Sequence, residues 1–351
     1  MLSDSVRPTA ASCPECPPVS RRSFLRQAAV GAGMASTILR GMPAAAASGA
    51  PAPRSETLVS TLYKSLSEPQ RKALCFGFAD PLRSKVDNNW HIVSPRVDEV
   101  LNRDQQALVR EIFLHLHREE YASSILKATE HDNGERGLGA CSVALFGEPG
   151  TGKFEFVLSG RHVTRRCDGD SVEGAAFGGP IFYGHSPLTD DEAPDHPQNV
   201  YWYQARRANE VFQALDGKQR DLALRPKGRR ESGSSTVRLK GKPGGLEGIP
   251  FSELTRDQRE LVQKVLADLL APFRKEDADE AMKWVSAGGL HDLHLAYFKD
   301  DDLGNDGIWD VWQIESPSMV WYFRGAPHVH TWVNIMSPAA ATAAAGAATG
   351  A

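Results

Sequence analysis

Beyond its first 47 residues the chain lacks a long uninterrupted hydrophobic run. The most apolar later segments, 113–117 and 269–272, are soon broken by charge or proline, whereas a membrane-spanning helix needs about 20 apolar residues. An excess of positive charge is also missing, because the part after residue 47 has 35 Lys and Arg against 42 Asp and Glu. These absences predict no membrane span in that part and argue against nucleic acid as a partner.

Cysteine is scarce, with five residues in 351. Cys13 and Cys16 lie near the amino terminus, ahead of a pair of arginines, which leaves Cys75, Cys141 and Cys167. These three allow one disulfide and one free thiol in an oxidising compartment, but a chain of this length does not need such a bond. No histidine adjoins any of them, so a catalytic thiol is the weaker interpretation.

Familiar catalytic motifs are missing as well. Residues 147–153, Gly-Glu-Pro-Gly-Thr-Gly-Lys, nearly match a nucleotide-binding phosphate loop, but Phe154 stands where Ser or Thr must hold magnesium. Residues 154–164 alternate like a strand, whereas that loop needs a helix there. We predict a Gly/Pro hairpin connection and no nucleotide cofactor. The chain also has no Ser-His-Asp elbow, Rossmann fingerprint or helical His-Glu-x-x-His motif.

A twin-arginine signal is the clearest feature that the sequence does contain. Ser20-Arg21-Arg22-Ser23-Phe24-Leu25 precedes an apolar run from Ala28 to Leu39 and four alanines at 44–47. This order is typical of a signal that a translocase reads in order to export folded proteins, although an ordinary secretory signal with two arginines is the alternative. We predict that residues 1–47 are removed and that the twin-arginine translocase exports the protein, with any cofactor already loaded, to the periplasm or cell exterior.

Two stretches of the chain follow one pattern. Residues 101–113 and 254–266 each predict an amphipathic helix with a polar cap, and a strand-like run follows each at nearly the same distance, at 141–146 and 293–298. Chance similarity of two helices is the alternative to a duplication. Amphipathic helices followed by antiparallel strands in hairpins, twice over, predict a single α+β domain over 48–336 with pseudo-repeats at about 60–215 and 245–336.

Two further segments have a biased composition. Residues 216–250 contain nine lysines or arginines together with many glycines and serines, which predicts a long exposed linker between the repeats. Residues 337–351 consist almost entirely of Ala, Thr and Gly, which predicts a disordered tail.

Several segments spread over the chain carry a family resemblance. They are 66–71, Trp90, 145–147, 156–162, 180–184 and 328–332. Together they resemble an exported bacterial family known only as a domain of unknown function, DUF3500. Its members usually show Gly-His-His where this chain has Gly160-Arg161-His162, so the chain looks like a divergent member. The resemblance implies an exported domain that covers nearly the whole mature chain, and it implies no established reaction.

Three histidines carry the sharpest chemical hypothesis. His328 and His330 lie two apart in a predicted strand and would therefore share a face as a chelating pair. His162 belongs to another predicted strand and could supply a third nitrogen. Three neutral imidazoles with an open position suit zinc, copper or ferrous iron, and such a metal could activate water or bind oxygen.

Other side chains are candidates for catalysis near these histidines. We predict Arg161 and Asp168 as catalytic residues. Candidates for a fourth ligand or a general base are Asp168, Asp170, Glu155 and His185. Arg161 with Arg165 and Arg166 could alternatively be a salt-bridged strand end or a fork for a carboxylate or phosphate. The histidines themselves could instead be structural, or perform acid–base chemistry without a metal.

Two functions from different classes follow. The first is a metal-dependent enzyme, hydrolytic or oxidative, acting on an unknown small molecule. The alternative is a non-catalytic periplasmic binding protein for a small polar or carbohydrate ligand, stacked on aromatic side chains. The candidate aromatics are Trp90, Tyr201, Trp202, Tyr203, Trp309, Trp312, Trp321 and Trp332. Exposed tryptophans near the histidine pair would favour binding, and buried ones would not.

Overall fold

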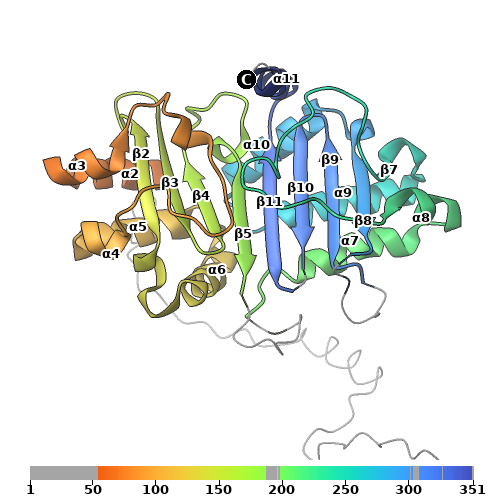
Figure 1. Cartoon of the computed structure of the whole chain (residues 1–351), viewed down its shortest axis with the longest axis horizontal. Coiled ribbons are helices and arrows are strands. Elements are labelled where there is room, and N and C mark those ends of the chain that lie inside the picture. The colour runs from red at the N-terminus through yellow and green to blue at the C-terminus, as the bar shows by residue number, and fades with distance from the viewer. Residues whose placement is uncertain are drawn as a thin grey trace, which may run out of the picture. The chain divides into compact units, whose positions relative to one another are not determined.

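The computed structural model describes residues 54–186, 196, 198–300, 302, 308–325 and 327–349. The predicted signal, residues 1–47, lies outside them. The described residues belong to one compact unit, in which helices cover one face of an 11-stranded, mostly antiparallel sheet (Figure 1). The fold is therefore α+β, as predicted.

The elements follow one another in two sets. The first contains α2 (Ser55–Ser65), α3 (Glu68–Leu74), β1 (Cys75–Phe76), α4 (Val97–Val100), α5 (Arg103–His115), α6 (Glu119–Asp132), β2 (Ser142–Gly147), β3 (Phe154–Gly160), β4 (Val163–Cys167) and β5 (Ile181–His185). The second contains α7 (Tyr203–Ala214), α8 (Gly217–Ala223), β6 (Leu224–Arg225), β7 (Ile249–Pro250), α9 (Arg256–Leu270), α10 (Lys275–Ala287), β8 (His294–Phe298), β9 (Val311–Ser316), β10 (Met319–Arg324) and β11 (Val329–Ile335), and α11 (Pro338–Thr349) ends the described chain.

The sheet has the order β1-β2-β3-β4-β5-β11-β10-β9-β8-β6, with β7 paired to β8. At its centre β5 and β11 run antiparallel, with Tyr183 opposite Thr331. At the two edges β1 and β6 run parallel to β2 and β8. The order of elements is thus the same on both sides of the β5–β11 pair except that α4 of the first set stands where the second set has β7, and α7 and α8 belong to the second set. The second set begins near residue 203, earlier than the predicted 245, and the duplication itself stays a prediction.

A pair of glutamines, one buried and one half-buried, joins the helices of the first set. Asn102 and Gln105 form a capping box at the start of α5, with each side chain accepting a hydrogen bond from the other's backbone N–H at 3.0 Å. The amide of Gln105 also faces that of Gln70 on α3, with nitrogen–oxygen distances of 2.8 and 3.2 Å.

The second set repeats this arrangement. Gln258, at the start of α9, accepts a hydrogen bond from the backbone N–H of Thr255 at 2.8 Å. Its amide faces that of Gln219 on α8, with distances of 2.9 and 2.8 Å. The polar cap predicted for each amphipathic helix is confirmed, and it also joins each helix to its neighbour.

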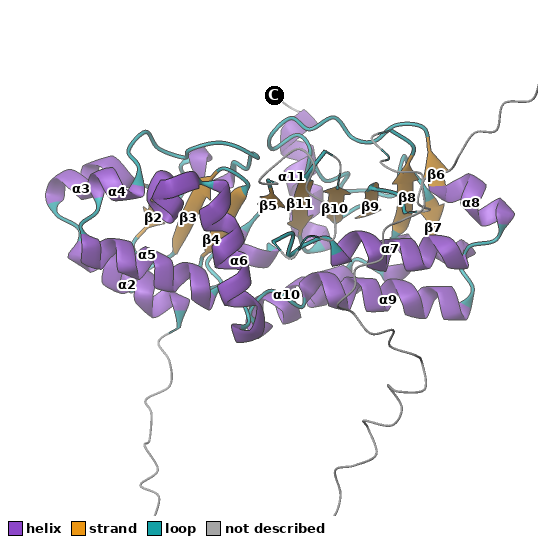
Figure 2. Cartoon of the chain, turned by 90° about the horizontal axis from the view of Figure 1, so that it is seen from below, coloured by secondary structure: helices purple, strands orange, loops and turns teal. Residues whose placement is uncertain are grey.

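One face of the sheet is covered by a layer of helices and the other by loops together with α11, as Figure 2 shows. The helical side carries the larger apolar core. On the other side, Val237 and Leu239 are 2% and 5% exposed and pack with Val320 and Trp332 of the sheet. The prediction of an exposed linker over 216–250 is therefore wrong, because this segment contains α8 and two short strands and its apolar side chains cover the sheet.

The end of the chain also differs from the prediction. Residues expected to be a disordered tail form α11. Ala341 is 1% exposed, and the hydroxyl of Thr342 donates to the carbonyl of Gly241 at 2.9 Å. Alanine has the highest intrinsic helix propensity, and contact with the 226–248 segment supplies the packing that a short isolated helix lacks.

The hairpin predicted in place of a phosphate loop is confirmed. The backbone N–H of Glu148 donates to the carbonyl of Lys153 at 3.1 Å, and β3 begins at Phe154. Gly147 has a φ of +75°, and a Cβ there would lie 2.1 Å from the Lys153 carbonyl oxygen. Only glycine is compatible with this turn.

The three cysteines in the part of the chain that the structure describes form no disulfide. Cys75, Cys141 and Cys167 are all free, and burial raises the pKa of the Cys141 thiol to about 12. A catalytic thiolate at these positions is disfavoured. Within the described ranges, no helix has the length and apolar character required to cross a bilayer.

Candidate metal centre

His162, His328 and His330 lie together where the two sets of elements meet. His330 is on β11 and His328 immediately precedes that strand. His162 lies in the turn between β3 and β4 with a φ of +55°, so the prediction that it sits on a strand is wrong. Its backbone N–H donates to Asn88 at 2.9 Å, and its carbonyl accepts from the N–H of Gly184 at 3.1 Å. These bonds hold the turn against β5, beside β11.

The three imidazoles face one another through their Nε2 atoms. The Nε2 of His330 lies 3.0 Å from that of His328 and 3.2 Å from that of His162. One nitrogen from each ring lies within 4.8 Å of the others. Nitrogens around a tetrahedral zinc ion, each about 2.0–2.1 Å from the metal, are about 3.3 Å apart. The predicted convergence is confirmed, and the group could hold a metal ion.

Carboxylates bind the far side of two of these rings. The Nδ1 of His162 lies 2.8 Å from Oδ2 of Asp132, at the end of α6. The Nδ1 of His330 lies 2.6 Å from Oε2 of Glu231. A carboxylate requires a donor, so each Nδ1 carries the proton and each Nε2 presents its lone pair to the cluster. Such carboxylate–histidine pairs are the usual outer shell of a metal centre.

Arg324 completes the second of these pairs. Its Nε donates to Oε1 of Glu231 at 2.8 Å, and its Nη2 lies 2.5 Å from Nδ1 of His330. Because Nδ1 cannot donate to Glu231 and also accept from Arg324, it donates its hydrogen bond to the carboxylate, and the ion pair with Glu231 holds Arg324 in place. Burial opposes ionisation of Glu231, but the hydrogen bond from His330 and the charge of Arg324 outweigh it and lower the pKa of the carboxyl.

The electrostatic environment favours the neutral form of His328 and His330. Burial, together with the neighbouring histidines, Arg324 and Arg161, lowers the pKa of His328 to about 3. Burial and the charge of Arg324 lower the pKa of His330 to about 4, against the opposing effect of Glu231. Neutral imidazole is the form that coordinates metals.

The two predicted catalytic residues lie in different places. Arg161 is beside the centre, directly before His162, and its Nη2 donates to the hydroxyl of Ser186 at 3.1 Å. Asp168 follows the far end of β4, about 17 Å along a five-residue strand, and accepts from the N–H of Val172 at 2.8 Å. Burial raises its pKa to about 7. The structure therefore does not bring Asp168 to the histidines.

The other candidate ligands do not join the three rings. Glu155 is fully buried in ion pairs with Arg83 at 2.8 Å and Arg166 at 2.5 Å. This fits the alternation of side chains along β3, which turns Glu155 away from the face that was expected to carry His162. His185, on β5, has its Nδ1 3.8 Å from Oδ1 of Asp132, so it borders the centre through that carboxylate.

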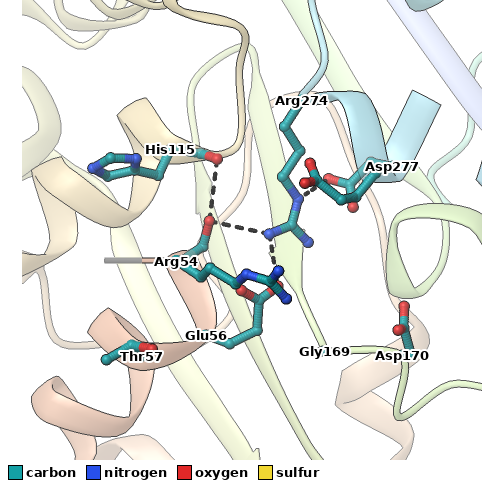
Figure 3. Close-up of a pocket in the computed structure, with 10 residues that line it drawn as sticks. Arg54, Glu56, Thr57, His115, Gly169, Asp170, Arg274 and Asp277 are labelled. Atoms are coloured by element: carbon teal, nitrogen blue, oxygen red, sulfur yellow. Dashed lines mark hydrogen bonds and ion pairs between the residues drawn. The ribbon is translucent and has the colours of Figure 1, made fainter. Parts of the chain in front are cut away.

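Asp170 lines a separate cavity of about 370 Å³ at the amino-terminal ends of α2 and α10 (Figure 3). There Arg274 pairs with Glu56 at 2.6 Å and with Asp277 at 2.8 Å. The Arg274 guanidinium also donates to the hydroxyl of Ser55 at 3.2 Å. These ion pairs join the first helix of the first set to α10 of the second, which is a structural role.

Asp132 and Glu231 are the site residues that the sequence did not reveal. Asp132 ends an ordinary amphipathic helix, and no motif marks it. Glu231 lies in the segment predicted to be an exposed linker, where an acid among many lysines and arginines gives no signal. The path of that segment across the sheet brings Glu231 to His330.

The aromatic residues do not form an exposed platform. Trp312 and Trp321 are 1% exposed and Trp332 is 0% exposed. Trp90 is half-buried and donates its indole N–H to the hydroxyl of Thr164 at 2.9 Å. Exposed tryptophans near the histidines would have favoured a carbohydrate-binding protein, but Trp312, Trp321 and Trp332 are buried.

Comparison with known protein families gives a match over most of the chain. The family model described as "Protein of unknown function (DUF3500)" matches residues 48–336, most of the chain. No curated protein and no solved structure matches.

Proposed function

We propose that this chain, which belongs to the DUF3500 family of proteins of unknown function, is a metal-dependent hydrolase with zinc at His162, His328 and His330. The observation that carries the proposal is the convergence of three Nε2 atoms whose rings are held from behind by Asp132 and Glu231. A bound zinc ion would lower the pKa of a coordinated water to about 7 and supply a hydroxide nucleophile.

The lone pairs of these nitrogens are suited to bind a cation. With each Nδ1 proton directed to a carboxylate, the Nε2 atoms of His162 and His330 face each other as acceptors at 3.2 Å. Two acceptors at that distance repel. A metal ion bound to both converts the repulsion into two coordinate bonds, and the carboxylates strengthen them by making the imidazoles more basic.

The donor set favours zinc and hydrolysis over oxygen chemistry. Non-haem iron enzymes typically use two histidines and one carboxylate, and electron-transfer copper sites use a thiolate. Among the described residues, the group that could hold a metal is made of three histidines alone. Three histidines with an open fourth position are a known catalytic zinc arrangement.

Export on the twin-arginine pathway accords with this function. Arg21 and Arg22 precede the apolar run of the predicted signal. A route that carries folded proteins lets a metal bind before export, so that the metal is chosen inside the cell. We therefore place the working enzyme in the periplasm or outside the cell.

Metal content tests the proposal directly. The full chain is purified from its expressing cells, and elemental mass spectrometry measures metal per chain in wild type, in His328→Ala/His330→Ala and in His291→Ala. His291 has a side chain that is 77% exposed, so its variant is the matched control. We expect about one zinc per chain in wild type and in the control, and a loss in the double variant.

Three outcomes are distinguishable. The proposal is supported if the protein binds zinc through the histidines and cleaves ester or phosphoester model substrates. A chelator should abolish this cleavage. Stoichiometric copper or iron overturns the hydrolytic assignment. A folded wild type without stoichiometric metal, or equal metal in the double variant, overturns the metal centre.

A further inference from the structure

We infer that the cavity beside the three histidines, lined by Arg96, Arg136 and Arg161, binds an oxyanion group of the substrate, a carboxylate or a phosphate. The assignment of this ligand as a substrate rests on the proposed function, whereas the anion site itself does not. The cavity has a volume of about 560 Å³, within the range of pockets that hold small molecules.

The charge of the cavity wall is predominantly positive. Arg96, Arg136 and Arg161 line it, and so does one acid, Asp132. The side chain of Asp132 has no exposed surface, and its oxygens accept from His162 and from the N–H of Ser186. Its charge is therefore engaged with the histidine centre, and the accessible charge is that of the arginines.

The three arginines are not equivalent. Arg136 forms ion pairs with Asp98 and Glu99, which neutralise much of its charge. Arg96 donates to the carbonyl of Ser94 at 3.1 Å. For Arg161 the structure gives, within the described part of the chain, one side-chain hydrogen bond, to the hydroxyl of Ser186, and no ion pair. Arg161 and Arg96 therefore keep equal numbers of unused donors, and of the two it is Arg161 that directly precedes His162 in the chain.

The backbone of Arg161 is fixed, although its side chain is exposed. Its N–H donates to Oδ1 of Asn133 at 3.1 Å, and Nδ2 of Asn133 donates back to its carbonyl at 3.1 Å. A guanidinium has five N–H donors, and its planar fork matches two oxygens of a carboxylate or phosphate. A side chain held at its base, with four donors unused, is prepared to bind an oxyanion.

The cavity and the histidine centre share their boundary. Asp132 lines the cavity and holds the ring of His162, and Arg161 directly precedes His162 in the chain. An oxyanion on Arg161 would therefore place the rest of a small molecule at the edge of the histidine centre, which the cavity reaches through Asp132 and Arg161. The structure points to anionic substrates whose reactive bond lies close to the carboxylate or phosphate.

Anion titration tests the site with inorganic phosphate and acetate as separate probes. Isothermal calorimetry at low ionic strength is performed on the full chain, on Arg161→Gln and Arg161→Lys, and on Arg256→Gln. Arg256 has an 89% exposed side chain on α9 and is the matched control. We expect binding of at least one probe to weaken by about 10-fold or more in Arg161→Gln, partly in Arg161→Lys, and not in the control. The tighter probe identifies the preferred oxyanion.

Because an anion could also bind a metal directly, the same titration is repeated on His328→Ala/His330→Ala. Binding that persists there and still depends on Arg161 supports the cavity even if the proposed metal function fails. Binding that disappears with the histidines, is unchanged in Arg161→Gln, or is absent in wild type overturns the inference. Metal content is measured for each variant, and we expect Arg161→Gln to keep the wild-type value.

Discussion

Asp132 accepts a hydrogen bond from Nδ1 of His162 at 2.8 Å, although 30 positions separate the two residues in the chain. Both oxygens of the carboxylate also accept from the backbone N–H of Ser186 at 3.0 Å. Asp132 therefore connects the end of α6, the β3–β4 turn and the end of β5. The end of α6 and the end of β5 therefore fix the orientation of the His162 ring together with its own turn.

The carboxylates behind the histidines are expected to control metal affinity. Asp132→Asn and Glu231→Gln keep an acceptor for Nδ1 but remove the negative charge, and loss of such a partner typically weakens metal binding by 10–100-fold. Competition for zinc against a chelator of known affinity measures the change. Glu260→Gln, at an exposed position on α9, is the control. Unchanged zinc affinity in both centre variants would contradict the assigned role.

The sequence predicted the helices and strands better than it predicted where the connecting segments and individual side chains lie. The amphipathic helices and antiparallel strands were predicted correctly because their periodicity is local. The three histidines were also grouped correctly, but the argument for His162 used strand alternation, whereas a turn with a left-handed φ orients it. Alternation specifies a face and not a position along a strand, which is why Asp168 was predicted near the histidines and lies at the other end of β4.

What the sequence could not show depends on long-range packing. Glu231 reaches His330 only because residues 226–248 cross the sheet, with Val237 buried there. A basic segment rich in glycine and serine gives no local sign of that path. Ala341 contacts this segment in the same way, so the composition of the tail alone indicated disorder where packing stabilises a helix.

Glu155 is expected to support the fold and not the centre. Its carboxylate and the Arg166 guanidinium have no exposed surface, so Glu155→Ala leaves a buried charge with less compensation and should cost about 3–5 kcal/mol of unfolding free energy. Urea denaturation measures the loss, with Glu148→Ala, at an exposed position in the β2–β3 turn, as the control. Metal per folded chain should stay at the wild-type value. A selective loss of metal would instead make Glu155 part of the centre.

Asp168 should make the protein less stable as the pH rises. Burial raises the pKa of this carboxyl from 3.8 to about 7 in the folded chain. Below pH 4 it is therefore protonated in the folded and in the unfolded state, and its titration does not change the free energy of unfolding. Between pH 4 and 7 it ionises first in the unfolded chain, which stabilises that state. Asp168→Asn removes this titration, and its stabilising effect should increase over that interval to on the order of 4 kcal/mol.

Urea denaturation of wild type and Asp168→Asn at pH 5 and pH 8 tests this sign. The advantage of the variant should be larger at pH 8. An advantage that is equal at the two values, or larger at pH 5, would show that burial does not control the ionisation of Asp168.

The paired glutamines should couple within each set of elements and not between sets. Gln70 and Gln105 exchange hydrogen bonds, as do Gln219 and Gln258. Alanine at any of the four should cost about 1–3 kcal/mol, because a buried amide then loses its partner. Double-mutant cycles should give a coupling energy of at least about 0.5 kcal/mol for each true pair. The mixed pair Gln70 and Gln258 serves as the control and should be additive.

Zinc should stabilise the protein by joining its two sets of elements. His162 belongs to the first set and His328 and His330 to the second, so a metal bound to all three adds a connection beside the β5–β11 pair that unfolding must break. A ligand that binds only the folded state, present at 100 times its dissociation constant, adds about 2.7 kcal/mol to the free energy of unfolding. Unfolding of the chelator-treated chain, followed with and without added zinc, should show this gain in wild type and not in His328→Ala/His330→Ala. Magnesium, which prefers oxygen ligands, should have no effect on either. A zinc-dependent gain that is equal in the two proteins would place the binding site elsewhere.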